Sequence, residues 1–546
     1  MMLRDELKTI LQGEVLTDEE TLQTFSHDTS LFEARPEVVV APKDREDIKA
    51  LVRYVSEHKK ESPKLSLTAR SGGSDMSGGP LSESIVVDCA SHLNHFSVDA
   101  VGISVTTEPG VFFRDFEKET RDSDMLFTPY PASKDLAAFG GMVMNNCAGE
   151  KTLRYGQMRK FVEELKMILA DGEEYSFRAL SPQELEEKRK LQTFEGEVYR
   201  KTHELLESHF DEIQAARPKV SKNASGYALW DVWDRKRFDF GQLFTGSQGT
   251  LGILTEAKLR LQKEKSHEAL ISVFFRSWDA LPEVVNALLP FDPESLEVFD
   301  SETLKLGIRF MPEIAKKAGS SFIPFALRFL PEVVMGAKLF GMPKLILLYQ
   351  IAEDSEEEVS RKVEVARKAL SPFPVLFRVM HEKREMDKYW VMRRESFNLL
   401  RQHVRGKRTI PFIDDFCILP KDTPRFLPEL LKILKEYQIK VNIAGHAGNG
   451  NFHIVPLMDM KKESERAKIQ PVAEKVFRLV VQYGGSITAE HNDGLIRSPY
   501  LKMMYGEKIY GLFEEVKRIF DPLGIFNPGK KTGASVEYAM EHLRKG

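Results

Sequence analysis

The first hundred residues alternate between strand-like and helix-like patterns of apolar side chains. Apolar runs at 37–41, 65–70 and 85–88 predict three short strands, and the alternation at 101–107 predicts a fourth. After the first strand, Asp44 is placed to cap a helix that runs to Lys60. The order of strand, helix, strand, glycine-rich loop and strand predicts an α+β nucleotide-binding unit.

Beyond residue 262 the pattern changes to longer strands and helices, such as a predicted helix at 355–370. Within the first half, the stretch 181–222 is charged and helical in character, which predicts a surface insertion. A C-terminal helix is predicted within 505–528, ending at Phe520-Asp-Pro. We therefore predict three parts, namely 1–262, 263–500 and a C-terminal segment 501–546 that returns to the first domain.

Residues 321–348 are strongly apolar, with Arg328, Lys338 and Lys344 spaced through them. One interpretation is a buried helix pair followed by a strand. The other is an interfacial helix that docks on a membrane or on a partner protein. No run of eighteen uninterrupted apolar residues occurs, so the sequence predicts no membrane-spanning helix.

Composition narrows the class of protein. The 546 residues are 42% hydrophobic and 29% charged, as in a globular protein, and the net charge of −4 argues against a nucleic-acid partner. Cys89, Cys147 and Cys417 are scattered singly, which excludes a disulfide framework and a Cys-ligated iron–sulfur cluster. The N-terminus lacks an apolar signal core, so we expect a cytoplasmic protein, or a peripheral one at the inner face of the membrane if 321–348 docks there.

Three glycine-rich segments lie in the first half, at 70–79, 140–149 and 246–252. Successive backbone N–H groups at glycines form concave anion sites and let a phosphate approach closely. The first segment is not a Walker loop, because no Gly-Lys-Ser/Thr follows, and it does not match GxGxxG at a helix start. Each segment alone is equally consistent with a flexible loop, but three together predict backbone wrapped around one extended, phosphate-bearing ligand.

Residues 445–453 read Gly-His-Ala-Gly-Asn-Gly-Asn-Phe-His, and residues alternate on both sides of this stretch. Since each glycine costs about 1 kcal/mol in a helix interior, a strand–turn–strand hairpin is favoured. Such a hairpin lets His446 and His453 converge, and a carboxylate could complete a site of two histidines and one carboxylate for a metal. The alternative is that the glycines mark an ordinary turn and the histidines are hydrogen-bonded structural residues.

Together, these segments resemble the FAD-binding proteins of the vanillyl-alcohol-oxidase and p-cresol-methylhydroxylase superfamily. The segment 70–79 is similar to its pyrophosphate loop, 131–156 to its second flavin segment, and 246–255 to its closing signature. The second half resembles the C-terminal domain of FAD-linked D-lactate, glycolate and D-2-hydroxyglutarate dehydrogenases. The resemblance implies an α+β fold, with a p-cresol-methylhydroxylase-type FAD-binding domain of two α+β subdomains and an α+β cap domain with an antiparallel sheet.

The resemblance also implies roles for individual residues. His446, His453 and Glu490 would bind a divalent metal (Zn, Mn or Fe), and His491 would be the general base. Arg394 would hold the substrate carboxylate, with its neighbour Arg393 as the alternative. FAD would be bound non-covalently, because no histidine lies in the segment 70–79. The implied FAD-binding residues are Arg70, Ser71, Gly72, Gly73, Ser74, Asp75, Pro131, Ser133, Gly140, Gly141, Asn145, Asn146, Gly149, Gly252, Ile253 and Asn527.

Two departures from the family pattern bear on function. Asn492 follows His491 where many relatives have glycine, and Ile413 stands where D-2-hydroxyglutarate dehydrogenases have a substrate-binding lysine, which disfavours that dicarboxylic acid. The resemblance implies a homo-oligomer that oxidises a small D-2-hydroxy acid, similar to D-lactate or glycolate, to the 2-oxo acid. Electrons would pass to an iron–sulfur protein or a quinone. Two alternatives stay open, a flavin transferase similar to alkylglycerone-phosphate synthase and an electron-transfer or assembly subunit of a larger complex.

Overall fold

Two small sheets form the first half of the chain in the computed structural model, which describes residues 3–121, 123–317, 321–329, 332, 341–403 and 408–545. The first sheet has the strand order β1-β2-β4-β3, in which β2, β4 and β3 are parallel. Asp44 caps helix α3 by accepting hydrogen bonds from the backbone N–H groups of Glu46 and Asp47, which confirms the prediction. The elements around this sheet are α1 (Leu3–Ile10), β1 (Glu14–Leu16), α2 (Glu19–Phe25), β2 (Val38–Ala41), α3 (Arg45–His58), β3 (Leu67–Arg70) and β4 (Ile85–Asp88).

The second sheet is antiparallel, with the strand order β5-β6-β10-β8-β9. Helices α7 to α9 occupy the stretch predicted as a surface insertion. Their charged faces are exposed, but Tyr199 and Leu206 of α8 are each only 1% exposed, so this stretch also contributes to the core and is not a mere surface addition. The elements are β5 (Phe96–Asp99), β6 (Ser104–Thr107), α4 (Phe113–Thr120), β7 (Met125–Leu126), α5 (Phe139–Met144), α6 (Thr152–Tyr155), β8 (Val162–Ile168), β9 (Glu174–Arg178), α7 (Pro182–Lys190), α8 (Phe194–Ser208), α9 (Phe210–Ala215), α10 (Leu229–Val232), α11 (Gly241–Phe244) and β10 (Ile253–Arg260).

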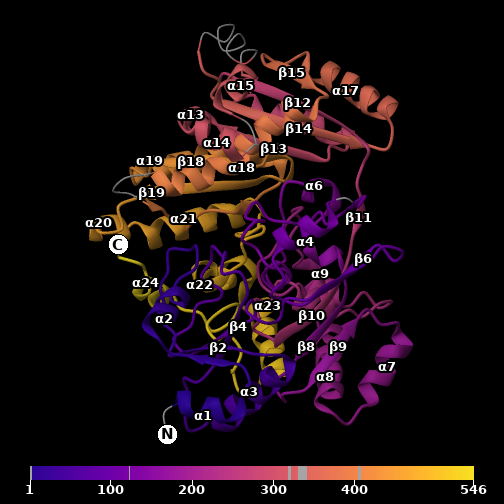
Figure 1. Ribbon diagram of the computed structural model, residues 1–546, viewed down its shortest axis with the longest axis vertical. Helices are drawn as coiled ribbons and strands as arrows, with labels where there is room; N and C mark the ends of the chain where they lie inside the picture. The colour runs from indigo at the N-terminus through magenta and orange to yellow at the C-terminus, as the bar shows by residue number, and fades with distance from the viewer. Residues whose placement is uncertain are drawn as a thin grey trace.

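An eight-stranded antiparallel sheet organises the second half, which lies at the top of Figure 1. Its order is β15-β12-β14-β13-β18-β19-β16, and β17 pairs with β19. The sheet is the antiparallel one that the fold prediction requires. The elements are β11 (Gln262–Lys263), β12 (His267–Phe275), α12 (Leu281–Leu288), β13 (Ser295–Asp300), α13 (Ser301–Arg309), α14 (Met311–Lys317), α15 (Phe322–Leu327), β14 (Leu345–Glu353), α17 (Glu356–Leu370), β15 (Leu376–Met380), α18 (Lys383–His403), β16 (Arg408–Thr409), β17 (Phe416–Cys417), α19 (Thr423–Glu436), β18 (Val441–His446), β19 (Asn451–Met458), α20 (Glu463–Arg466) and α21 (Ile469–Gln482).

The C-terminal segment lies among the elements of the first half, where it is drawn in yellow beside β2 and β4 (Figure 1). It contains α23 (Leu501–Phe520) and α24 (Val536–Glu541), and α22 (Gly494–Arg497) lies just before it. Helix α23 ends at Phe520, as predicted, because Pro522 cannot continue it. The helix is kinked at Gly506, whose φ of +77° is not helical, and this kink lies next to the predicted start at 505. After the helix, the N–H of Asn527 donates to the carbonyl of Leu67 in β3, so this segment is hydrogen-bonded to the first sheet.

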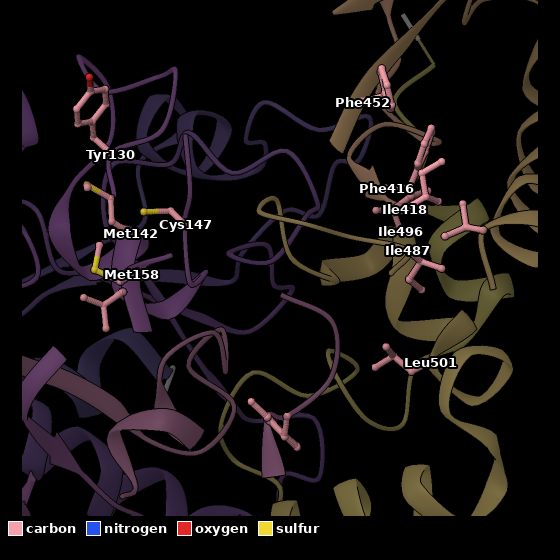
Figure 2. Packing of buried hydrophobic residues seen from close by; sticks show 14 of the residues in the cluster. Tyr130, Met142, Cys147, Met158, Phe416, Ile418, Phe452, Ile487, Ile496 and Leu501 are labelled. Atoms are coloured by element: carbon pink, nitrogen blue, oxygen red, sulfur yellow. The ribbon is translucent and has the colours of Figure 1, made fainter. Parts of the chain in front are cut away.

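Buried apolar side chains of both halves belong to one contiguous cluster. Figure 2 shows Tyr130, Met142 and Met158 from the first half on one side, and Phe416 and Phe452 from the second half on the other. Because the core is shared, the two halves are held in a fixed position relative to each other.

The apolar segment 321–348 is only partly within the described residues, because 330, 331 and 333–340 lie outside them. Strand β14 at its end is buried at the centre of the large sheet, as the first interpretation requires. In α15, Ile323 and Leu327 are 68% and 56% exposed. The choice between a buried and a docking helix therefore stays a prediction. Among the described helices, none combines the length and the apolar character needed to cross a membrane.

Candidate active site

One cavity between the two halves collects all three glycine-rich segments. Its second-half wall includes Arg393, Arg394, His453, Glu490 and His491. The predicted FAD-binding residues that line it are Arg70, Ser71, Gly72, Gly73, Ser74, Asp75, Pro131, Ser133, Gly140, Gly141, Asn145 and Gly252. Segments that are far apart in the sequence thus face the same space, as a single extended ligand requires.

The backbone of this wall is open where a ligand would approach. A Cβ atom at Gly141 would meet no atom within 4 Å, so only a missing side chain keeps this part of the cavity free. Gly73 and Gly249 have φ angles of +64° and +66°, which side chains rarely adopt. These features fit the phosphate-bearing group of a dinucleotide such as FAD, held by main-chain groups.

Four predicted FAD-binding residues do not line the cavity and instead support its wall from behind. Asn146 accepts a hydrogen bond from the N–H of Arg159 and donates to the carbonyl of Asn223. Gly149 allows a close backbone approach, since a Cβ there would lie 2.0 Å from the carbonyl oxygen of Tyr130. Ile253 is buried in the core. Asn527 donates to the carbonyls of Gly79 and Gln248, and so ties two loops together.

The histidine hairpin forms as predicted. Strands β18 and β19 pair in antiparallel register through the turn at 447–450, with Ala444 opposite His453. Gly450 in this turn has a φ of +68°, and a Cβ would lie 1.9 Å from the carbonyl oxygen of Ile418, so a side chain is excluded. The hairpin brings the rings of His446 and His453 to a centroid distance of 5.3 Å.

Three imidazoles converge on one carboxylate oxygen. The Nε2 atoms of His446 and His453 each lie 3.3 Å from Glu490 Oε1, and Nε2 of His491 lies 3.8 Å from the same atom. His446 lies behind the cavity wall, whereas His453, Glu490 and His491 line the cavity. The predicted metal-binding residues therefore lie around Glu490. Among the described residues, however, the side chains whose ligand atoms all lie within 4.8 Å of one another are Asp415, His453, Glu490 and His491, so this group includes the predicted base and not His446.

The opposite ring nitrogens are held by other carboxylates. His446 Nδ1 donates to Glu297 Oε1 at 2.6 Å, and His453 Nδ1 donates to Asp414 Oδ1 at 3.0 Å. Asp414 Oδ2 also lies 3.1 Å from His491 Nδ1. For His446 and His453, the carboxylate on Nδ1 fixes the tautomer that leaves Nε2 as the ligand atom, which is the usual arrangement around a metal. The donor set therefore fits a divalent cation among the Nε2 atoms and Glu490.

Neighbouring charges shift the pKa values of the carboxylate and the imidazoles of this cluster in opposite directions. Burial opposes the ionisation of Glu490, but Lys222 and His446 hold its pKa well below the ordinary value. Burial also opposes the protonation of His453, yet Asp414 and Glu490 raise its pKa to about 10. For His491 the same opposition from burial is outweighed by Asp415 and Asp414, which raise its pKa. A bound metal would replace the protons between these imidazoles and Glu490, because it binds the neutral ring.

Asp415 is a functional residue that sequence reasoning missed. Its carboxylate accepts hydrogen bonds from the N–H groups of Ala489, Glu490 and His491 and from the hydroxyl of Thr488. The adjacent Asp414-Asp415 carboxylates between apolar residues were the only local signal for this role. Asp415 lies among the groups able to hold a metal, but its oxygens are occupied by these donors, so we assign it to positioning the turn.

Lys222 was also missed, and it is buried at 0% exposure. Its Nζ lies 2.9 Å from Glu490 Oε2 and 3.2 Å from Asn451 Oδ1. One oxygen of Glu490 therefore faces the imidazoles while the other is neutralised from the first half of the chain. Nothing in the sequence around Lys222 indicates a partner 268 residues away.

The two candidate arginines differ in their surroundings. Arg393 is 7% exposed, and its Nη2 lies 3.2 Å from Glu297 Oε2, on the same carboxylate that holds His446. Arg394 is paired with Glu150 through Nε at 3.1 Å and through Nη2. Both arginines line the cavity and each has a carboxylate partner, so the choice of Arg394 over Arg393 stays a prediction.

Asn492 replaces glycine without losing the turn. Its φ is +66°, in the left-handed region that asparagine tolerates better than most residues. Its Nδ2 donates to the carbonyls of Asn145 and Gly246 at 3.1 Å and 2.9 Å. The departure from the family pattern thus adds a link between the turn after His491 and two of the glycine-rich segments.

Comparison with known proteins agrees with this geometry. Residues 36–178 match the FAD binding domain, and residues 264–531 match the C-terminal domain of FAD linked oxidases. The chain belongs to the FAD linked oxidases. A relative from Pseudomonas putida, a D-2-hydroxyglutarate dehydrogenase, is 28% identical over 95% of the chain, and the chain spans about half (50%) of its length. Glycolate oxidase subunit GlcD of Bacillus subtilis is 23% identical, with 93% of the chain and 91% of that protein covered.

The fold of this FAD linked oxidase is that of p-cresol methylhydroxylase. The solved structure of that enzyme with substrate bound has a TM-score of 0.68 at 15% identity, covering 96% of this chain and 95% of the other. Both the predicted FAD-binding half and the cap half are therefore correct in architecture. The division at 262 and 500 stays a prediction.

Proposed function

We propose that this FAD linked oxidase oxidises a small D-2-hydroxy acid to the 2-oxo acid and passes the electrons to a separate acceptor. The observation that supports it best is the convergence of three Nε2 atoms on Glu490 at the wall of the cavity that the glycine-rich segments line. Relatives named as D-2-hydroxyglutarate dehydrogenase and glycolate oxidase subunit agree with this chemistry.

Each side chain has one task in the proposed reaction. The hydroxyl proton goes to the neutral imidazole of His491, which lines the cavity beside Glu490. Arg394 holds the carboxylate and thereby selects the face of the α-carbon that is presented. Bound FAD would supply the oxidant by taking the α-hydride with its two electrons, and a divalent metal held by His446, His453 and Glu490 would polarise the hydroxyl group. The cap half closes the site on the side away from the glycine-rich segments.

The substrate is proposed to be small and to carry one carboxylate. Ile413, where D-2-hydroxyglutarate dehydrogenases have a lysine, is buried at 0% exposure and offers no charge for a second carboxylate. An iron–sulfur protein or a quinone is the proposed electron acceptor, because the three cysteines are buried separately and provide no cluster of their own.

Two variants test the assignment of roles. His491→Ala should abolish reduction of the flavin by D-lactate while leaving the absorption spectrum of bound FAD intact. His446→Ala should lower the metal content measured by elemental analysis, with FAD retained. Unchanged turnover in the first variant, or stoichiometric metal in the second, would refute the corresponding role.

A further inference from the structure

We infer that Glu150 is the positioning residue for Arg394, and that it turns the guanidinium so that its outer edge faces the substrate carboxylate. This inference rests on the proposed function and adds a specific determinant of substrate binding to it. Glu150 comes from the first half of the chain, just after Gly149, whereas Arg394 comes from α18 of the second half. The two residues therefore couple the FAD-binding half to the substrate-binding half.

The geometry of the pair leaves one edge of the guanidinium available. Glu150 accepts hydrogen bonds from Nε and from Nη2 of Arg394. A guanidinium has five N–H groups, so both N–H groups of Nη1 and one of Nη2 are not bonded to Glu150, and one N–H of each of these two nitrogens forms the outer edge. Arg394 lines the cavity and Glu150 does not, which means that the carboxylate holds the arginine from behind. A second carboxylate can then bind the outer edge by two parallel hydrogen bonds.

The surroundings of Glu150 and Arg394 hold the pair in place and favour its charges. Its side chain is 10% exposed, compared with 34% for that of Arg394. Tyr130 donates its hydroxyl to Glu150 Oε1 at 2.9 Å. Burial would raise the pKa of Glu150, but Arg394 lowers it to about 2, so the carboxylate is ionised. On the other side, the guanidinium carbon of Arg394 lies 5.3 Å from the centre of the Trp390 ring.

A purely structural role is the competing explanation, because neighbouring residues also bridge the two halves. Lys151 Nζ lies 3.1 Å from Glu294 Oε1, and Arg154 Nη2 lies 2.8 Å from Glu353 Oε1. These pairs bind the same two halves but do not contact Arg394. Lys151→Met is therefore a matched control, since it removes an adjacent ion pair between the halves without touching the arginine.

The test is steady-state kinetics of the FAD-loaded enzyme with D-lactate and an artificial dye. Glu150→Gln keeps the shape of the side chain but leaves one acceptor for two donors. It should raise the KM for D-lactate about ten- to hundredfold, while kcat stays within about threefold. Glu150→Asp should recover part of the loss, and Lys151→Met should leave KM within about twofold. FAD content and thermal unfolding are measured for each variant to establish that the variants are folded.

The outcomes distinguish a failure of the positioning role of Glu150 from a failure of the proposed function. An unchanged or lower KM in Glu150→Gln would overturn the inference, since a lower value means that Glu150 competes with the substrate carboxylate. Equal losses in Glu150→Gln and Lys151→Met would assign the pair to bridging alone. If no D-2-hydroxy acid reduces the wild-type flavin, the proposed function itself fails and the positioning role fails with it.

Discussion

Asp415→Asn is the substitution from which the largest and most specific effect is expected. The carboxylate accepts hydrogen bonds from Asn451 Nδ2, from the Thr488 hydroxyl and from three successive N–H groups at 489–491. An asparagine has only one acceptor oxygen. The NH2 group of the new asparagine would face N–H and O–H donors. The Asn451 amide cannot rotate to offer its oxygen instead, because its Oδ1 already accepts from Lys222.

The magnitude follows from these contacts. A hydrogen bond to a charged acceptor contributes about 1.5–3 kcal/mol, compared with about 0.5–1.5 kcal/mol for a neutral pair, and a buried donor without a partner costs about 1–3 kcal/mol. Allowing for relaxation, we expect a loss of about 3–5 kcal/mol in the free energy of unfolding of the second half. The melting temperature should then fall by roughly 10 °C. Glu490 and His491 are carried by the same turn, and a shift of about 1 Å costs roughly a hundredfold in rate.

The assay combines thermal unfolding, metal content, flavin absorbance and turnover with D-lactate. Asp47→Asn is the matched control, because Asp47 is also buried and accepts hydrogen bonds from the N–H groups of Gln12, Gly13 and Lys43, far from the site. Both variants should lose stability, but only Asp415→Asn should lose metal and activity. Full metal content and turnover within about threefold of wild type in Asp415→Asn would refute the positioning role.

Two other predictions concern the turn and the pH dependence. Asn492→Ala should destabilise the FAD-loaded protein by about 1 kcal/mol more than Asn492→Gly. Both variants lose the hydrogen bonds to Asn145 and Gly246, but only alanine is strained at a φ of +66°. Equal melting temperatures of the two variants would contradict this prediction. Glu150 has a pKa of about 2 in the folded protein, below its ordinary value of 4.5, so it stabilises the fold above pH 4.5 and loses this effect as the pH falls towards 2. Below pH 4.5 the free energy of unfolding should therefore fall less steeply with decreasing pH in Glu150→Gln than in the wild type. Identical slopes would exclude the effect.

Local sequence patterns were sufficient for features whose partners are close in the chain. The cap at Asp44 and the hairpin of His446 and His453 follow from spacing alone, because turn glycines and alternating side chains act over a few residues. Their convergence with Glu490 and the cavity was implied by the family resemblance. It could not be derived from spacing, since the hairpin and the turn that carries Glu490 pack together only in the folded chain.

Long-range partners explain most of what the sequence did not reveal. Lys222, Glu297 and Glu150 act on residues 149 to 268 positions away, and charged side chains of this kind are normally solvated on the surface. Asn146 and Asn527 resemble ligand-binding residues because they occur in the family motifs. Their amides are instead used to join loops behind the cavity wall.

The central claim is that FAD in the cavity of the first half meets a D-2-hydroxy acid at the histidines of the second. The most direct measurement is anaerobic bleaching of the flavin absorption band across a panel of D- and L-2-hydroxy acids. We expect rapid bleaching by small D-2-hydroxy acids in the wild type, little by the L-enantiomers, and none in His491→Ala. A protein that binds no FAD, or bound FAD that no 2-hydroxy acid reduces, would contradict the account.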